Sequence, residues 1–172
     1  MADVAKSSRK GSSTFEIVSR SVEETQQLGE ALGRLLAPGD VLGLCGELGS
    51  GKTTFIQGLA KGLGINQDLV RSPTFILLRD YPGRLPLIHV DGYRLDGAPA
   101  AVWLDVEWLF DPKKVTVIEW ADRITDCLPE DYLEMRFAHK TTNQRAIAAV
   151  PHGSRATQVV GQLRKVHARP GD

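Results

Sequence analysis

The stretch VLGLCGELGSGKTT, residues 41–54, decides the fold. Its first five residues are an almost continuous apolar run, as a strand covered on both faces requires. The next eight match the phosphate-loop pattern G-x-x-x-x-G-K-[ST]. Apolar residues then recur at helical spacing from Phe55 to Leu63, and Gly64 follows as a helix end. A buried strand, a glycine-rich loop and a helix in this order predict an α/β domain with a P-loop NTPase-like three-layer fold.

Each residue type in the loop suits phosphate. Glycines let successive backbone amides point into one concavity at a helix N-terminus, where they hold anionic oxygens. Lys52 adds a mobile positive charge, and the Thr53 hydroxyl can ligate magnesium. The predicted nucleotide-binding residues of this segment are Gly46, Glu47, Leu48, Gly49, Ser50, Gly51, Lys52, Thr53 and Thr54. A glycine-rich helix entry without a ligand is the alternative.

The flanking segments indicate a mixed parallel and antiparallel sheet with residues 41–45 as its central strand. Ser21 and Glu24 form a capping-box pattern after a strand at 14–19 and start a helix that reaches about Ala37. Segments 75–81 and 85–91 are spaced for an antiparallel hairpin. A helix is predicted around 100–110, a strand that can join the sheet in parallel at 115–120, and a second antiparallel pair at 133–137 and 145–150.

Composition bounds the remaining possibilities. With 172 residues, 42% apolar and 24% charged, the chain fits one domain. Cys45 and Cys127 are its only cysteines, and no apolar stretch reaches the roughly 18 residues of a membrane span. A disulfide scaffold is thereby excluded, and Cys45 is interpreted as core packing. The polar start MADVAKSSRKGSS lacks the apolar run of a secretory signal, so a cytoplasmic protein is expected.

Charge is distributed unevenly along the chain. We predict a disordered polar tail at 1–13, an ATPase domain at 14–153 and a basic tail at 154–172. The two tails carry a net charge of +5 and the body −5. A body of this sign lacks the basic stripe of a nucleic-acid-binding domain, so contact with tRNA is expected through partners. The acidic region 96–134 is either a solvated face or a docking surface.

Acids follow two of the apolar runs, Asp91 after 85–90 and Glu119 after 115–118. Such acids are costly to bury without a metal or a donor, and hydrolysis needs carboxylates that order magnesium and water. We predict that role for both, with a hydrogen-bonded structural acid as the alternative. His89 shares a face with Asp91, and packing is favoured over catalysis. Trp120 either covers the nucleotide or fills the core.

Four motifs together resemble one family. GELGSGKTTF at 46–55, SPTF at 72–75, HVDGYRL at 89–95 and EWADR at 119–123 occur in the order and spacing of TsaE, formerly YjeE. This family comprises bacterial P-loop ATPases required for threonylcarbamoyladenosine at position 37 of tRNA. The resemblance covers about residues 14–150. It implies ATP with Mg2+ as ligands, association with the TsaD and TsaB proteins, and support for turnover of the modifying complex without transfer of the threonylcarbamoyl group.

The resemblance also implies roles for single residues. Thr53 and Glu119 would ligate magnesium, and Asp91, with Lys52, would act in catalysis near the γ-phosphate. Thr25 would lie near the base. The predicted switch-like loop consists of Ser72, Pro73 and Thr74; a proline-containing turn entering a strand is the alternative.

The sequence departs from the family pattern at two places. Gly92 replaces a larger apolar residue, which is expected to loosen that strand end. Segment 97–110 is more apolar than the acidic helix usual in the family and lacks the glycine that usually follows it. The second departure affects the expected partner surface and leaves the nucleotide site unchanged.

Two other functions compete with this interpretation. A small P-loop kinase acting on a metabolite would need a closing lid, commonly rich in arginine, and the acidic 96–134 region is a poor one. The other alternative is an adaptor that binds a nucleotide and never hydrolyses it. The sequence contains no N-K-x-D string, which favours ATP over GTP. Arg94 is the only arginine near the predicted site, so slow hydrolysis by the isolated protein is expected.

Overall fold

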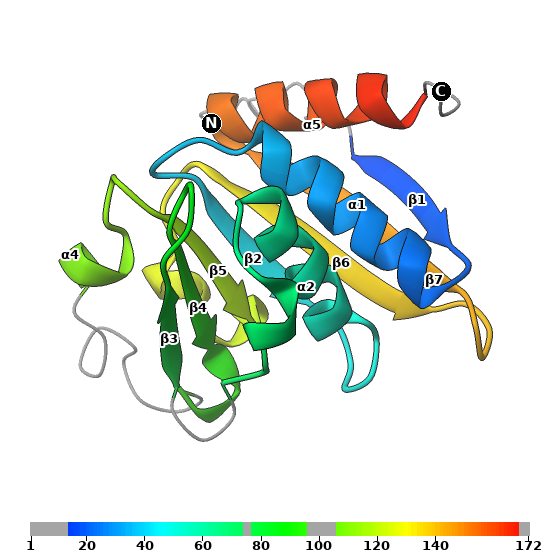
Figure 1. Cartoon of the computed structure of the whole chain (residues 1–172), viewed down its shortest axis with the longest axis horizontal. Helices are drawn as coiled ribbons and strands as arrows, with labels where there is room; N and C mark the ends of the chain where they lie inside the picture. The colour runs from blue at the N-terminus through cyan, green and yellow to red at the C-terminus, as the bar shows by residue number, and fades with distance from the viewer. Residues whose placement is uncertain (1–13, 74–76, 96–105, 169–172) are drawn as a thin grey trace, which may run out of the picture.

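The computed structural model describes residues 14–73, 77–95 and 106–168. Its centre is one sheet of seven strands in the order β1-β7-β6-β2-β5-β4-β3 (Figure 1). The strands are β1 (Phe15–Ser19), β2 (Val41–Cys45), β3 (Leu78–Tyr81), β4 (Leu87–Asp91), β5 (Val115–Glu119), β6 (Tyr132–His139) and β7 (Arg145–His152). The α-helices are α1 (Val22–Leu35), α2 (Lys52–Gly62), α4 (Val106–Leu109) and α5 (Gly153–His167). Short 3-10 turns are η1 (Gln67–Leu69), η2 (Gly92–Leu95), η3 (Ala121–Arg123) and η4 (Thr125–Cys127).

The sheet is mixed, as predicted, and β2 is its middle strand. β2 is parallel to both β5 and β6, and β4 is parallel to β5. The pairs β3–β4, β6–β7 and β1–β7 are antiparallel. The carboxyl ends of β2, β4 and β5 therefore meet at one edge, where a ligand site in such a sheet is expected.

Helix α1 begins where the capping box places it. The Ser21 side chain accepts a 3.0 Å hydrogen bond from the Glu24 amide, which satisfies one free donor of the first turn. The Glu24 carboxylate accepts in return from the amide of Arg20, one residue before the cap. The predicted start of the helix is confirmed.

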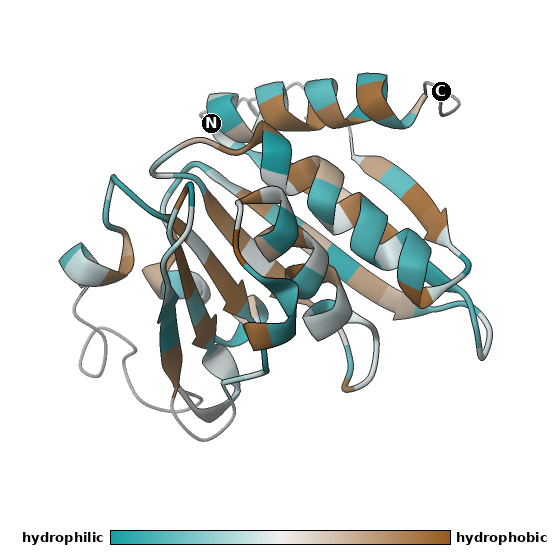
Figure 2. Ribbon diagram, viewed as in Figure 1, coloured by the Kyte–Doolittle hydropathy of each residue, from teal (hydrophilic) through white to brown (hydrophobic). Residues whose placement is uncertain are grey.

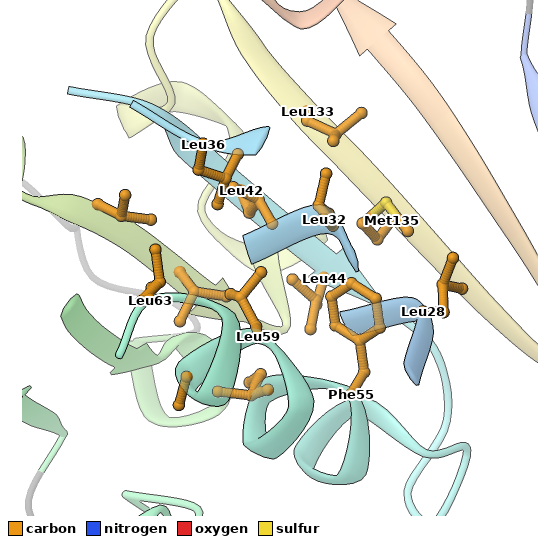
Figure 3. Packing of buried hydrophobic residues seen from close by; sticks show 14 of the residues in the cluster. Leu28, Leu32, Leu36, Leu42, Leu44, Phe55, Leu59, Leu63, Leu133 and Met135 are labelled. Atoms are coloured by element: carbon orange, nitrogen blue, oxygen red, sulfur yellow. The ribbon is translucent and has the colours of Figure 1, made fainter. Parts of the chain in front are cut away.

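Helices α1, α2 and α5 pack against one face of the sheet, and Figure 2 shows apolar colouring along the central strands beneath them. Figure 3 shows leucines of α1 meeting Leu44, Phe55 and Met135 in this core. A smaller cluster on the other face includes Ile118, Leu109 of α4 and Ala121 of η3. In the described part of the chain, the second covering layer therefore consists of short segments.

Glycines allow α1 and α2 to approach each other closely. A Cβ on Gly29 would overlap the carbonyl oxygen of Phe55, and one on Gly58 would overlap that of Gln26. Gly33 and Gly62 face each other in the same way one turn further along. This packing holds the start of α2, and with it the preceding loop, against α1.

The segment assigned to a basic tail is a helix up to His167, which corrects the prediction for 154–172. Four buried residues bind α5 to the core, namely Ala156, Val159, Val160 and Leu163. Asp131 also holds the start of α5, because its two carboxylate oxygens accept hydrogen bonds from backbone amides of the first helical turn. The donors are the amides of Arg155, at 2.8 Å, and Ala156, at 3.0 Å. The charges of this segment are typical of a tail, whereas the i, i+3, i+4, i+7 spacing of its buried apolar residues is that of an amphipathic helix.

The bounds of two other predicted elements differ from those in the structure by a few residues. Strand β3 begins at Leu78, within the predicted 75–81, of which 75–76 lie outside the described residues. The helix expected around 100–110 is α4, and 100–105 lie outside the described residues, as does the predicted tail at 1–13. Among the described helices, none has the length and apolar character needed to span a bilayer.

Candidate functional site

The loop of residues 46–53 runs from the end of β2 into α2. Its backbone has positive φ at Gly49 (75°) and Gly51 (104°), a conformation that glycine adopts without strain. Gly51 precedes the first residue of α2, so the amides of the first helical turn face the loop. Among the described residues, no heavy atom of another segment lies within 4 Å of a Cβ built on Gly49, so these residues leave space beside this part of the loop.

Lys52 is the first residue of α2, and only 5% of its surface is exposed. Its ammonium group donates hydrogen bonds to the carbonyl oxygens of Gly46 (2.6 Å) and Glu47 (2.9 Å). It also lies 4.2 Å from the centroid of the Trp120 ring. Burial lowers the pKa of Lys52, and the nearby Glu119 carboxylate opposes this shift. The backbone of the loop thus holds the Lys52 ammonium group beside its first residues.

Two buried acids stand side by side across from the loop. Asp91 ends β4 and Glu119 ends β5, and the two residues are partners in the parallel register. Their exposed fractions are 1% and 4%. Thr53 Oγ1 donates to Glu119 Oε1 at 3.3 Å, which links α2 to β5. Asp91 Oδ1 accepts from the amide of Tyr93 at 2.9 Å.

A cavity of about 290 Å³ lies between the loop, the start of α2 and the end of β5, and Asp91 is not among the residues that line it. Its lining consists of Leu48, Gly49, Gly51, Lys52, Thr53, Thr54, Ser72, Glu119 and Trp120. Residues predicted from three separate motifs therefore surround one space. Ser72, of the predicted switch loop, lines it, and Pro73 is buried next to it along the chain. Thr74 lies outside the described residues, as does the side chain of Arg94.

A second cavity of about 300 Å³ adjoins the loop and shares Gly51 and Thr54 with the first. Its other lining residues are Arg20, Ser21, Val22, Thr25, Thr142, Asn143 and Arg145. The Thr25 hydroxyl is already hydrogen-bonded to Ser19 Oγ at 2.7 Å. The residues at 142–145 were not predicted, because the turn between β6 and β7 carries no motif and reaches the loop only through sheet pairing.

Trp120 borders the first cavity with a strained backbone. Its φ of 56° is one of two positive values among described non-glycine residues, the other being that of Leu77. Such conformations cost about 1–3 kcal/mol and cluster at functional sites. The Trp120 ring contacts Tyr93 edge-on at 5.1 Å, and the Arg123 guanidinium lies 4.5 Å from the Tyr93 ring. Trp120 is half-buried and lines the first cavity.

Gly92 tightens the strand end that it was expected to loosen. A Cβ at this position would lie 2.8 Å from the carbonyl oxygen of Trp120 and 2.9 Å from that of Glu119. Real Cβ atoms do not approach backbone oxygen this closely. Glycine at 92 therefore allows η2 to pass directly over the end of β5.

The donors at the site suit magnesium bound together with phosphates. Thr53 and the two acids offer oxygen atoms, which Mg2+ prefers. Within residues 14–73, 77–95 and 106–168, no three His, Cys, Asp or Glu side chains form a metal-binding group. Mg2+ usually takes one or two carboxylates and completes its shell with water and phosphate oxygens. The residues present fit that mode of binding.

A central parallel strand that leads through a glycine-rich loop into a helix, within this mixed sheet, defines a P-loop-like α/β protein. The sequence profile of the family described as "Threonylcarbamoyl adenosine biosynthesis protein TsaE" matches residues 19–147. The chain belongs to the TsaE family.

Relatives and a solved structure agree with this assignment. The tRNA threonylcarbamoyladenosine biosynthesis protein TsaE of Bacillus subtilis (strain 168) is 37% identical over 142 residues, which are 82% of this chain and 88% of the relative. The protein of the same name from Treponema pallidum is 45% identical over 113 residues, 66% of this chain and 83% of the relative. The crystal structure of Bacillus subtilis YdiB superposes with a TM-score of 0.77 at 30% identity, over 90% of this chain and 97% of that one.

Proposed function

We propose that this protein is the ATP-binding, slowly ATP-hydrolysing component of the system that makes threonylcarbamoyladenosine at position 37 of tRNA. Its nucleotide state would control its association with the TsaD and TsaB proteins. Family membership and the names of the relatives support the pathway. The observation that carries the ATPase proposal is the cavity in which Lys52, Thr53 and Glu119 meet.

Binding follows from the loop and its two cavities. The free amides of the first turn of α2 would hold the phosphates, and Lys52 would exchange its bonds to loop carbonyls for bonds to phosphate oxygens. The second cavity, which begins at Gly51 and Thr54, would take the nucleoside, with Thr25 in its wall. The lack of an N-K-x-D string favours adenine as the base.

Hydrolysis would use the strand-end acids. Thr53 and Glu119 would hold magnesium, which supplies positive charge to the terminal phosphates when bound. Asp91 would orient the attacking water, because its Oδ1 is held by the Tyr93 amide and the carboxylate retains further lone pairs. Among the described residues, no arginine lines the first cavity to stabilise the transferring phosphate. Slow turnover without a partner follows.

Coupling to partners would use the segment that contains Ser72. This residue lines the cavity, and the chain beyond it leads to β3 at the surface. A loop that contacts a γ-phosphate loses that contact on hydrolysis, which changes the surface a partner reads. The expected partners are TsaD and TsaB.

The test combines calorimetry, turnover and capture. ATP and GTP are titrated with and without Mg2+, hydrolysis is timed with and without added TsaD and TsaB, and the tagged protein is used to capture them in ATP or ADP. We expect Mg2+-dependent ATP binding, slow hydrolysis alone and nucleotide-dependent capture. Rapid turnover alone, or equal capture in both nucleotides, would contradict the proposal. A phosphorylated metabolite would establish the kinase alternative.

A further inference from the structure

His89 lies directly behind the proposed metal site. It is on β4, is 0% exposed, and its Nε2 lies 3.0 Å from Glu119 Oε1. It precedes Asp91 by two residues, so both side chains are on the same face of the sheet. The oxygen that it contacts is the one that Thr53 Oγ1 also contacts. One carboxylate oxygen of Glu119 is therefore held from two sides.

The second observation concerns buried polar atoms. In the described part of the chain, three buried side-chain atoms lack a hydrogen-bond partner, namely Arg79 Nε, Tyr81 OH and His89 Nδ1. Arg79 is the register partner of His89, and Tyr81 that of Leu87, so all three lie on one face of the β3–β4 pair. Each such atom costs about 1–3 kcal/mol and calls for an explanation.

Packing alone does not explain a histidine at this position. A leucine would fill a similar volume on this face and leave no polar atom of its own unpartnered. What histidine adds is the hydrogen bond to Glu119. A carboxylate can only accept, so His89 Nε2 carries the hydrogen of this bond.

Without this bond Glu119 has a competing partner. The Glu119 carboxylate interacts electrostatically with Lys52, whose ammonium donates to the loop carbonyls. A glutamate released from His89 keeps only the 3.3 Å bond from Thr53 and rotates more easily toward this cation. A pair between Lys52 and Glu119 would occupy both the phosphate-binding charge and the metal-binding carboxylate.

We propose that His89 is a positioning residue, which fixes the Glu119 carboxylate beside Thr53 for the magnesium ion of a bound nucleotide. This inference rests on the proposed function. It assigns His89 a role that its sequence context did not favour. Residues that orient metal ligands in this way typically contribute about 10–100-fold to metal affinity.

Two variants separate positioning from packing. The side-chain nitrogen of glutamine can take the place of histidine Nε2, whereas that of asparagine takes the place of Nδ1 and does not reach Glu119. The full chain with His89→Gln or His89→Asn is titrated with a non-hydrolysable ATP analogue, once with Mg2+ and once with EDTA. Manganese binding, followed by electron paramagnetic resonance, gives a second readout. Tyr81→Phe is the control, since it removes a buried polar atom from the same face without touching Glu119.

We expect His89→Asn to lose about 10–100-fold of the affinity for the analogue with Mg2+ and none with EDTA. His89→Gln should retain most of the affinity, and Tyr81→Phe all of it. The inference would be overturned if His89→Asn lost the same affinity with Mg2+ as with EDTA, or lost none at all. In either case, Mg2+-dependent binding by the wild type would still uphold the proposed function. If the wild type gains nothing from Mg2+, the proposed function fails and the inference with it. Should His89→Asn not fold, His89→Leu gives the same comparison, because it also lacks a donor to Glu119.

Discussion

The ammonium group of Lys52 donates a 2.6 Å hydrogen bond to the carbonyl oxygen of Gly46, so the cation of the loop is bound to the loop's own backbone. In the proposed function, a nucleotide would replace this bond and the one to Glu47 with bonds to phosphate. The affinity that Lys52 contributes is therefore a difference between two sets of charge-assisted hydrogen bonds, each worth about 1.5–3 kcal/mol.

The first prediction concerns Lys52→Ala. This change removes the positive charge that would contact the outer phosphates. We therefore expect ATP binding to fall below detection in calorimetry, while the circular dichroism spectrum is retained. Lys61→Ala is a matched control on the same helix, because Lys61 is 57% exposed and pairs with Glu30 away from the loop. Unchanged ATP affinity in Lys52→Ala would refute the assignment of the loop.

The second prediction separates the roles of the two acids. Asp91→Asn keeps an acceptor for the Tyr93 amide but loses the charge that orients water, so we expect kcat to fall about 100-fold or more with ATP binding little changed. Single-turnover hydrolysis follows the loss of rate, and calorimetry measures the affinity for ATP. Asp80→Asn, an exposed acid of β3 paired with Lys114, is the control and should behave as wild type. Equal rates in Asp91→Asn and wild type would remove Asp91 from the mechanism.

The third prediction is that Glu119→Gln weakens binding where Asp91→Asn does not. An amide oxygen is a poorer magnesium ligand than a carboxylate, so the affinity for ATP should fall with Mg2+ present and stay constant in EDTA. Calorimetry in both conditions gives the comparison. A variant with the wild-type response to Mg2+ would show that Glu119 is not a metal ligand.

Much of the fold, and the residues of the candidate site, could be predicted from the sequence for local reasons. The capping box starts α1, the apolar run at 41–45 is the central strand, and the loop joins it to α2. These features depend on neighbours in the chain, which short-range patterns encode. The acids Asp91 and Glu119 were placed at strand ends, and parallel pairing then makes them register partners.

The remaining features depend on contacts between distant segments. The hydrogen bond from His89 to Glu119 needs the register of β4 and β5, and no local pattern reveals it. Arg145 reaches the second cavity because β6 and β7 form a hairpin. Glycines 29 and 58 have no special backbone angle and are explained only by the neighbouring helix.

The fourth prediction concerns the reactivity of Cys45. Burial raises the pKa of this thiol to about 11, and the charges of Asp122 and Glu134 add to the effect. At pH 8 the native thiolate is then about 100-fold scarcer than in the unfolded chain, whose thiol has its ordinary pKa of 9.0. Iodoacetamide labelling of Cys127→Ser protein, followed by mass spectrometry with and without urea, should show that ratio. Similar rates in both states would contradict the raised pKa of this half-buried thiol.

The fifth prediction uses the contact between α1 and α2. Gly58→Ala places a methyl group against the carbonyl oxygen of Gln26, so the helices must separate, and we expect a loss of about 1–3 kcal/mol or more in the free energy of unfolding. Gly161→Ala is the matched control, since it lies in α5 with no heavy atom of another described segment within 4 Å of its Cβ, and should gain about 0.5–1 kcal/mol. Urea unfolding measures both. Because α1 carries Thr25 and α2 carries Lys52, the separation should also weaken ATP binding in Gly58→Ala under native conditions. A Gly58→Ala protein as stable as Gly161→Ala would contradict the close contact between the two helices.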